Sequence, residues 1–211
     1  GKIIFDGRDI SDPDRQTMTY LRENMQIIFQ DPYSSLNPRK SVAEIIATPL
    51  KVNHICKDRA SLQKRVRELM DTVGLAERLY DAYPHELDGG RRQRICIARA
   101  LAINPKFIVC DEPVSALDVS IQAQILNLLM DLQDEMGLTY MFITHDLSVV
   151  KHISSEIMVM YLGRCVEYAP ANELFENPVH PYTKALLSAI PIPDISMRGK
   201  NIQTIRGEVS S

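Results

Sequence analysis

Several features that would assign the sequence to a specialised class of protein are absent. None of its apolar runs is long enough to cross a membrane, and no signal peptide opens the chain. The four cysteines form no Cys-x-x-Cys pair, and Cys96 and Cys110 lie in apolar runs typical of buried, reduced thiols in a reducing cytosol. The net charge is only −3, which gives no sign of a nucleic-acid binder. If the protein acts at a membrane, it does so through a partner.

What remains is the composition of an ordinary soluble globular protein, with 45% hydrophobic and 24% charged residues. A length of 211 residues suits one substantial domain, or a domain with a smaller lobe. The first residues, GKIIFDGRDI, predict two strands joined by an Asp6-Gly7 turn. The chain has no initial Met, and its closing residues IRGEVSS carry no structural signal, so we expect it to be a fragment.

The first half of the chain is predicted to be mostly helical. A short apolar strand at MQIIFQ (25–30) precedes DPYSSLNPR, which its two prolines, two serines and asparagine predict to be a loop. From about Ser41 to Tyr83 the apolar residues follow a helical period, and Pro84 ends this stretch. One amphipathic face consists of Leu62, Val66, Leu69, Met70 and Val73.

The second half alternates strands and helices. FIVCDE (107–112) and LTYMFITH (138–145) predict buried strands, and IMVMYLGRCVEYA predicts two more around Gly163. Strand, helix and strand in this order imply a right-handed parallel α/β unit, whose ligands bind at the carboxyl ends of the strands. The intervening helix is predicted to carry Ile121, Ile125, Leu128, Leu129, Leu132 and Met136 on one face. The polar strand ends are Asp111, Glu112 and His145.

The motif LDGGRRQR (87–94) is similar to a phosphate-handling turn, yet Asp88 puts a negative charge where a phosphate is expected. Taken singly, this and the other polar motifs have ordinary explanations: a tight Gly-Gly turn, acids at the start of a loop, a helix cap, a loop histidine. The order of the motifs decides between these explanations. That order is Gln30, Leu-x-Gly-Gly, a strand ending in Asp-Glu-Pro, SALD (115–118) and a strand ending in Thr-His-Asp.

This ordered set resembles the nucleotide-binding subunit of ATP-binding-cassette (ABC) transporters. Gln30 matches the Q-loop, LDGGRRQR the signature motif (usually LSGGQ), FIVCDE the Walker B strand, SALD the D-loop and THD the switch histidine. The resemblance implies an α/β fold, namely an ABC-type nucleotide-binding domain with a parallel core sheet, an antiparallel β subdomain and an inserted helical subdomain (about 41–104), truncated at the N-terminus. FQDPYSSLNPR, MYLGRCVE and NPVHPYTKALLSAIP further resemble dipeptide and oligopeptide importer ATPases, the F-type subunit more than the D-type. The implied domains are a partial ATPase domain (1–170) and part of that family's C-terminal extension (171–211).

The resemblance also implies a role for each matching residue. Gln30 would sense the γ-phosphate and Mg²⁺, and a groove beside it and the helical subdomain would receive a permease helix. Asp111 would hold Mg²⁺ through water, Glu112 would be the general base, and His145 would contact the γ-phosphate. The residues that would close over ATP bound to the partner subunit are Leu87, Asp88, Gly89, Gly90 and Arg91. Those that would line the dimer interface are Ser115, Ala116, Leu117 and Asp118.

The implied cofactors are ATP and Mg²⁺. Some relatives carry an iron-sulfur cluster near the C-terminal end, but only Cys165 is nearby here, so we expect none. The implied partners are a second, homologous ATPase subunit, two membrane permease subunits and an extracytoplasmic peptide-binding protein, with no nucleic acid. The implied location is the cytoplasmic face of a prokaryotic cell membrane. No GxxxxGK(S/T) motif occurs, so the phosphate-binding loop is missing and we expect the chain as given to be inactive alone.

Asp88 leaves alternative functions open. It caps a helix as well as the usual Ser, but it loses a hydroxyl donor and repels a phosphate. Two unit charges about 4 Å apart repel by about 4 kcal/mol at an effective dielectric of 20, and Arg91 and Arg92 are expected to offset much of this. The alternative is a degenerate, non-catalytic subunit that docks on a permease and dimerises, although intact Glu112 and His145 argue against it. A soluble, translation-associated cassette ATPase would not explain the HPYTKALL segment.

Overall fold

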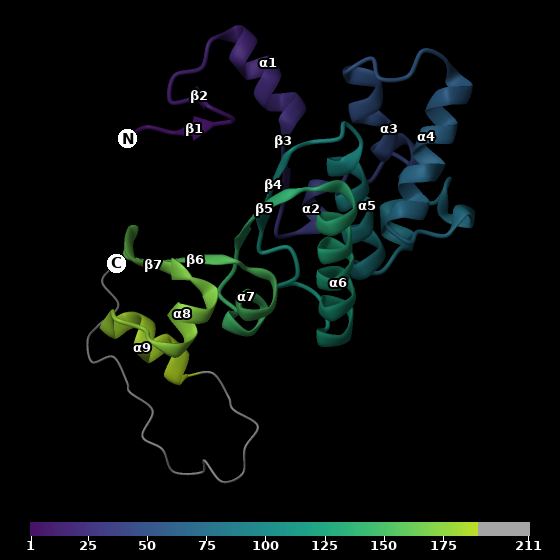
Figure 1. The fold of residues 1–211 in the computed structure, drawn as a ribbon. Helices are drawn as coiled ribbons and strands as arrows, with labels where there is room; N and C mark the ends of the chain where they lie inside the picture. Colours follow the sequence, from purple (N-terminus) through teal and green to yellow (C-terminus); the bar gives the residue numbers. More distant parts are fainter. Residues whose placement is uncertain (190–211) are drawn as a thin grey trace. The chain divides into compact units, whose positions relative to one another are not determined.

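The computed structural model describes residues 1–189, apart from the side chain of Ser148. The chain divides into two compact units, residues 1–143 and the residues from 144 onward (Figure 1). The predicted C-terminal extension (171–211) therefore lies partly outside the described residues, and its boundary at 170 stays a prediction. No helix in the described part of the chain is long and apolar enough to span a bilayer.

The first unit opens with the predicted hairpin. Strand β1 (Ile4–Phe5) pairs antiparallel with β2 (Arg8–Asp9). Asp6 and Gly7 both have a positive φ, at 49° and 75°, as the tight turn of a two-residue hairpin requires. Helix α1 (Arg15–Asn24) follows, and its first turn is capped by Asp14, whose Oδ1 accepts a hydrogen bond from the Thr17 N–H at 2.7 Å.

A three-stranded parallel sheet forms the centre of the first unit. Strands β3 (Met25–Ile28), β4 (Phe107–Asp111) and β5 (Thr139–Ile143) lie in the order β3-β4-β5. Helix α5 (Gly89–Leu101) packs against β3, and α6 (Val119–Met136) packs against α5. The predicted apolar face of α6 is buried at Ile125, Leu129 and Leu132 and partly buried at Ile121 and Leu128, whereas Met136 at its end is exposed. Cys96 and Cys110 are free and buried, as predicted, and burial raises the pKa of the Cys110 thiol to about 12.

One face of this sheet is open in the described residues. Ile28 and Cys110 on one face are fully buried, whereas the other face exposes Ile27 (40%), Met141 (47%) and Ile143 (45%). The prediction that the β5 run is wholly buried is therefore wrong. Successive side chains of β5 point to opposite faces of the sheet, so an uncovered face exposes alternate residues.

The segment predicted to be a loop contains a one-turn helix, α2 (Pro32–Ser35). The Asp31 carboxylate accepts hydrogen bonds from the Tyr33 N–H at 2.8 Å and the Ser34 N–H at 3.3 Å. Pro32 occupies the first helical position, where its missing N–H costs nothing. The proline and serines that predict a loop also suit the first turn of a helix, because Asp31 before them provides the cap.

The predicted helical stretch is divided into α3 (Val42–Val52), α4 (Arg59–Thr72) and the short 3₁₀ turns η1 (Glu77–Leu79) and η2 (Pro84–Glu86). The predicted amphipathic face is confirmed: Val66, Leu69, Met70 and Val73 are buried, and Leu62 is partly buried.

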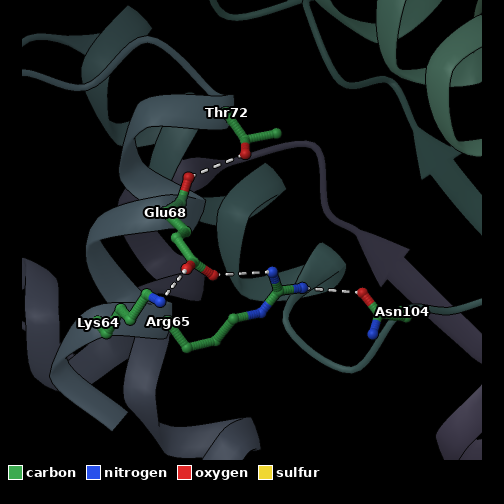
Figure 2. Close-up of polar contacts among 5 residues, drawn as sticks. All are labelled: Lys64, Arg65, Glu68, Thr72 and Asn104. Carbon is green, nitrogen blue, oxygen red and sulfur yellow. Dashed lines mark hydrogen bonds and ion pairs between the residues drawn. The ribbon is translucent and has the colours of Figure 1, made fainter. Parts of the chain in front are cut away.

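A polar network joins α4 to the turn after α5 (Figure 2). Arg65 Nη2 donates to Asn104 Oδ1 at 2.9 Å, and Arg65 and Lys64 both pair with Glu68. The Thr72 hydroxyl donates to the Glu68 carbonyl at 2.9 Å. Asn104 has a left-handed φ of 52°, and the Arg65 contact holds this turn at the entry to β4.

The second unit consists of α7 (Leu147–Ile153), β6 (Glu156–Tyr161), β7 (Arg164–Pro170), α8 (Ala171–Glu176) and α9 (Pro181–Ser188). Strands β6 and β7 form an antiparallel hairpin whose turn has Gly163 at φ 73°, which confirms the predicted pair. The small core of this unit contains Val150, Ile157, Val159, Ala171 and Leu174. Glu167 accepts hydrogen bonds from the N–H groups of Val179 at 2.7 Å and His180 at 3.0 Å, which fixes the segment before α9.

Candidate functional site

The carboxyl ends of β3 and β4 bring two of the predicted site residues into contact. Gln30 lies two residues beyond β3, and Glu112 directly follows β4. The Gln30 Nε2 group donates a hydrogen bond to Glu112 Oε2 at 2.7 Å. The amide therefore orients the carboxylate, and this contact joins residues that are far apart in the sequence.

Glu112 has a constrained backbone. Its φ of 44° lies in the left-handed region, which is unusual for a residue other than glycine and costs of order 1–3 kcal/mol. Its N–H donates to the Ile143 carbonyl at 2.9 Å. Its own carbonyl accepts from the Ser115 N–H at 3.2 Å and the Ser115 hydroxyl at 3.1 Å. Contacts on both sides of Glu112 thus hold the conformation that ends the strand and fixes where its carboxylate lies.

Asp111 is the last residue of β4 and is partly buried. The side-chain oxygen donors at this strand end include the Asp111 and Glu112 carboxylates and the amide oxygen of Gln30, whose nitrogen is bound to Glu112. Within the described residues no three His, Cys, Asp or Glu side chains gather as a metal cage. Such a sparse set of hard oxygen donors fits Mg²⁺, which keeps several waters and takes phosphate oxygens as further ligands.

The signature turn begins helix α5. Asp88 is the N-cap residue, and its Oδ1 accepts a hydrogen bond from the Arg91 N–H at 2.8 Å, which confirms the predicted cap. Its Oδ2 pairs with Arg91 Nη1 at 3.2 Å, so Arg91 partly neutralises the acid. The predicted contribution of Arg92 to this offset stays a prediction, because the contacts that the structure shows for it are with other groups. Its guanidinium lies over the Tyr33 ring, 4.2 Å from the ring centroid, and its Nε donates to the Pro84 carbonyl at 2.6 Å.

The two signature glycines allow close packing against the following motif. A Cβ atom on Gly90 would lie 2.7 Å from Ile121 Cγ2, and one on Gly89 would lie 3.0 Å from Leu117 Cδ2. The signature turn therefore packs on the predicted D-loop and the start of α6. Leu87, just before the cap, is buried.

The predicted D-loop is held by a residue that was not expected from the sequence. Gln122 Nε2 donates to the carbonyls of Val114 and Leu117, both at 3.0 Å. Asp118 occupies the N-cap position of α6 as expected, but its side chain makes no capping hydrogen bond. A glutamine in the first turn of a helix is too common in proteins for its reach back to the loop to be read from the sequence. The exposed residues of this loop are Ser115, Ala116 and Asp118.

His145 belongs to the second unit. It is exposed and lies in the turn between β5 and α7, where the Asp146 N–H donates to the Thr144 hydroxyl at 3.0 Å. Its predicted contact with a γ-phosphate stays a prediction.

Two family profiles match the chain. Residues 1–115 match the family described as ABC transporter, and residues 166–211 match the family described as oligopeptide/dipeptide transporter, C-terminal region. The oligopeptide transport ATP-binding protein OppF of Bacillus subtilis is 57% identical over 92% of this chain. OppF of Salmonella typhimurium is 53% identical over 100% of it, and the dipeptide transport ATP-binding protein DppF of Haemophilus influenzae is 51% identical over 100%. The chain spans 64% of the length of each of these relatives.

Solved structures show the same architecture. The chain is similar to cbiO1 from Clostridium perfringens, part of the ABC transporter complex cbiONQ, with a TM-score of 0.73 and 31% identity over 82% of this chain and 67% of that one. It is also similar to the ATP-binding cassette MJ0796 in a dimeric post-hydrolysis state bound to ADP and phosphate, with a TM-score of 0.70 and 30% identity over 81% and 73% of the two chains. These similarities confirm the predicted α/β cassette fold.

Proposed function

The chain belongs to the ABC transporter family of ATP-binding subunits, and on this premise we propose that the full-length protein hydrolyses ATP to power the import of di- or oligopeptides. The observation that carries the proposal is the hydrogen bond from Gln30 to Glu112 at the end of a parallel strand. A carboxylate held by an amide at this edge of the sheet is suited to accept a proton from water. The names of the similar OppF and DppF proteins support the substrate class.

Each of the predicted site residues has its own role in the proposed reaction. Glu112 is the general base that takes a proton from the attacking water, a contribution of about 10²–10⁴-fold. Gln30 holds the Glu112 carboxylate. Its amide oxygen and the Asp111 carboxylate would hold the cation, Asp111 through water. His145 contacts the γ-phosphate. Bound MgATP supplies the phosphoryl group that is transferred to water and the cation that draws charge from it.

The signature residues act on the nucleotide of the partner subunit. The N–H groups of Gly89 and Gly90, at the start of α5, are suited to a phosphate, and Leu87, Asp88 and Arg91 complete the turn. The Asp88–Arg91 ion pair lowers the repulsion that the acid would exert on this phosphate. The D-loop residues Ser115, Ala116, Leu117 and Asp118 line the interface between the two ATPase subunits.

The proposed assembly contains a second, homologous ATPase subunit, two permease subunits and an extracytoplasmic peptide-binding protein, at the cytoplasmic face of the membrane. A permease helix docks beside Gln30 and the helical subdomain (about 41–104). Residues 1–170 form the partial ATPase domain, and 171–211 belong to the C-terminal extension. The protein uses ATP and Mg²⁺, without an iron-sulfur cluster and without nucleic acid. Because the 211 residues contain no GxxxxGK(S/T) motif, they bind MgATP weakly by themselves.

The second candidate function is a degenerate subunit that docks and dimerises without turnover, and Asp88 is the observation in its favour. Proteoliposomes that contain the full-length protein, its partner ATPase and the permeases separate the two candidates. With the peptide-binding protein outside and MgATP inside, we expect uptake of a radiolabelled tripeptide. Glu112→Gln in this subunit should reduce that uptake to background even when the partner ATPase is left unchanged. Uptake that is unaffected by Glu112→Gln would favour the degenerate subunit.

A further inference from the structure

Helix α2, which follows Gln30, is held against α5 by three side chains of α5. Arg92 lies over the Tyr33 ring at 4.2 Å, and Arg99 Nη1 donates to the Ser35 carbonyl at 2.6 Å. The Ser35 hydroxyl and the Cys96 thiol are in hydrogen-bond contact at 3.2 Å. A helix of a single turn is not stable by itself, so α5 determines where α2 lies.

Arg92 makes a second contact with the same guanidinium group. Its Cζ atom lies over the Tyr33 ring, while Nε donates to the Pro84 carbonyl at 2.6 Å. Pro84 begins the η2 turn, which leads directly into Leu87 and Asp88. A guanidinium can stack and donate from its edge at once, whereas the compact ammonium group of lysine cannot match both geometries.

Arg92 therefore connects the segment that follows Gln30 with the signature turn. On one side, Gln30 contacts Glu112 and stands two residues before α2. On the other, the signature turn of Asp88 to Arg91 begins the helix that carries Arg92. Tyr33 and Arg92 thus form a continuous chain of contacts from the segment that follows Gln30 to η2 and the first turn of α5.

We propose that Arg92 is a positioning residue that couples the Gln30 segment to the signature turn, so that the subunit's own ATP site and the site it completes on its partner communicate through α2 and α5. This inference rests on the proposed function, because it assigns the two ends of the linkage to two ATP sites. Such coupling is reciprocal: each nucleotide changes the affinity for the other by the same factor.

Hydrogen exchange of the full-length protein tests the linkage without any need for activity. In Arg92→Lys and Tyr33→Leu we expect the amides of Tyr33, Ser34 and Ser35 to exchange about two- to fivefold faster, which is the loss of one exposed cation–π contact. Tyr33→Phe keeps the ring and should match wild type. Core amides such as those of Leu69 and Ile97 should be unchanged, which excludes general unfolding. Equal exchange at residues 33–35 in wild type and Arg92→Lys would overturn the proposal.

The functional consequence is measured in the assembled transporter, by steady-state ATP hydrolysis against ATP concentration. Wild type and Tyr33→Phe should give a Hill coefficient above one, and Arg92→Lys should move it toward one with kcat kept within about twofold, since the coupling and not the chemistry is lost. A wild-type coefficient of one, or an unchanged coefficient in Arg92→Lys, would refute the coupling and leave the proposed ATPase intact. Absence of hydrolysis in wild type would instead refute the proposed function, and the exchange result would then still decide whether Arg92 links the two segments.

Discussion

Replacement of Asp88 should separate its two effects, on stability and on the partner's nucleotide. The side chain caps α5 through a 2.8 Å bond to the Arg91 N–H and pairs with the Arg91 guanidinium at 3.2 Å. Loss of the cap costs about 0.5–2 kcal/mol. The two side chains are 59% and 46% exposed, so the ion pair is worth only about 0.2–1 kcal/mol. Asp88→Ala loses both contributions, whereas Asp88→Ser keeps the cap and loses only the smaller one.

Thermal unfolding of the full-length protein measures this difference. For a domain of about 150–250 residues, 1 kcal/mol shifts Tm by roughly 2–4 °C. Asp88→Ala should therefore lower Tm by several degrees, and Asp88→Ser by about 0–4 °C. Equal losses in the two variants would show that the cap is not what Asp88 contributes to stability.

The same variants test whether the Asp88 carboxylate repels the phosphate of the partner's nucleotide. An unscreened acid about 4 Å from a phosphate charge would cost about 4 kcal/mol, but Arg91 already pairs with Asp88, so the gain from its removal is much smaller. In the assembled ATPase pair, Asp88→Ser should strengthen ATP-driven association, or raise turnover at the site this signature covers, by about two- to tenfold. Arg91→Gln should have the opposite effect, because it exposes the charge of Asp88. If Asp88→Ser instead loses activity, the carboxylate has a positive role, such as the placement of Arg91, and the repulsion argument fails.

Three further predictions concern the phosphate contact, the missing loop and the packing of the signature turn. His145→Ala in the assembled transporter should reduce turnover strongly by removal of a γ-phosphate contact, and an unchanged rate would make His145 an ordinary loop residue. Isothermal titration of the 211-residue chain with MgATP should detect weak binding or none, because the phosphate-binding loop is missing; micromolar affinity would contradict this. Gly90→Ala should destabilise the protein by about 1–3 kcal/mol, since its Cβ would lie 2.7 Å from the stiff, β-branched Ile121 side chain. Denaturant unfolding of Gly90→Ala with and without Ile121→Ala checks the last point, and a penalty that persists in the double variant would exclude the clash as its cause.

Local chemistry was the part of the fold that could be predicted. The Asp6-Gly7 and Gly163 turns, the Asp88 cap and the apolar strands are each specified by neighbouring residues, and all are confirmed. The ordered motifs also identified the family and its peptide-importer branch, which the family matches and the similar proteins confirm.

What could not be predicted depends on distant partners. The residues of helix α2 were predicted to form a loop. The helix is stabilised by contacts of Ser35 with Cys96 and Arg99 of α5, which lie 61 and 64 positions further along the sequence. The exposure of Met141 depends on which face of the sheet is covered, which an apolar run does not reveal. The contacts of Arg92 with the Pro84 carbonyl and the Tyr33 ring could not be predicted either, because both partners lie outside its helix. The order of motifs placed Gln30 and Glu112 in one site, yet their direct hydrogen bond is a property of the folded chain.

The most direct test of the central claim is the rate of ATP hydrolysis by the assembled transporter with Glu112→Gln in this subunit, measured in a single turnover after MgATP-driven association of the two ATPase subunits. The glutamine keeps the shape of the side chain and can still accept the hydrogen bond from Gln30, but it cannot take a proton from water. The account predicts that association with MgATP survives while hydrolysis at this subunit's site falls by about 10²–10⁴-fold. Retention of more than half of the wild-type rate at that site would contradict it, because Glu112 would then not be the base.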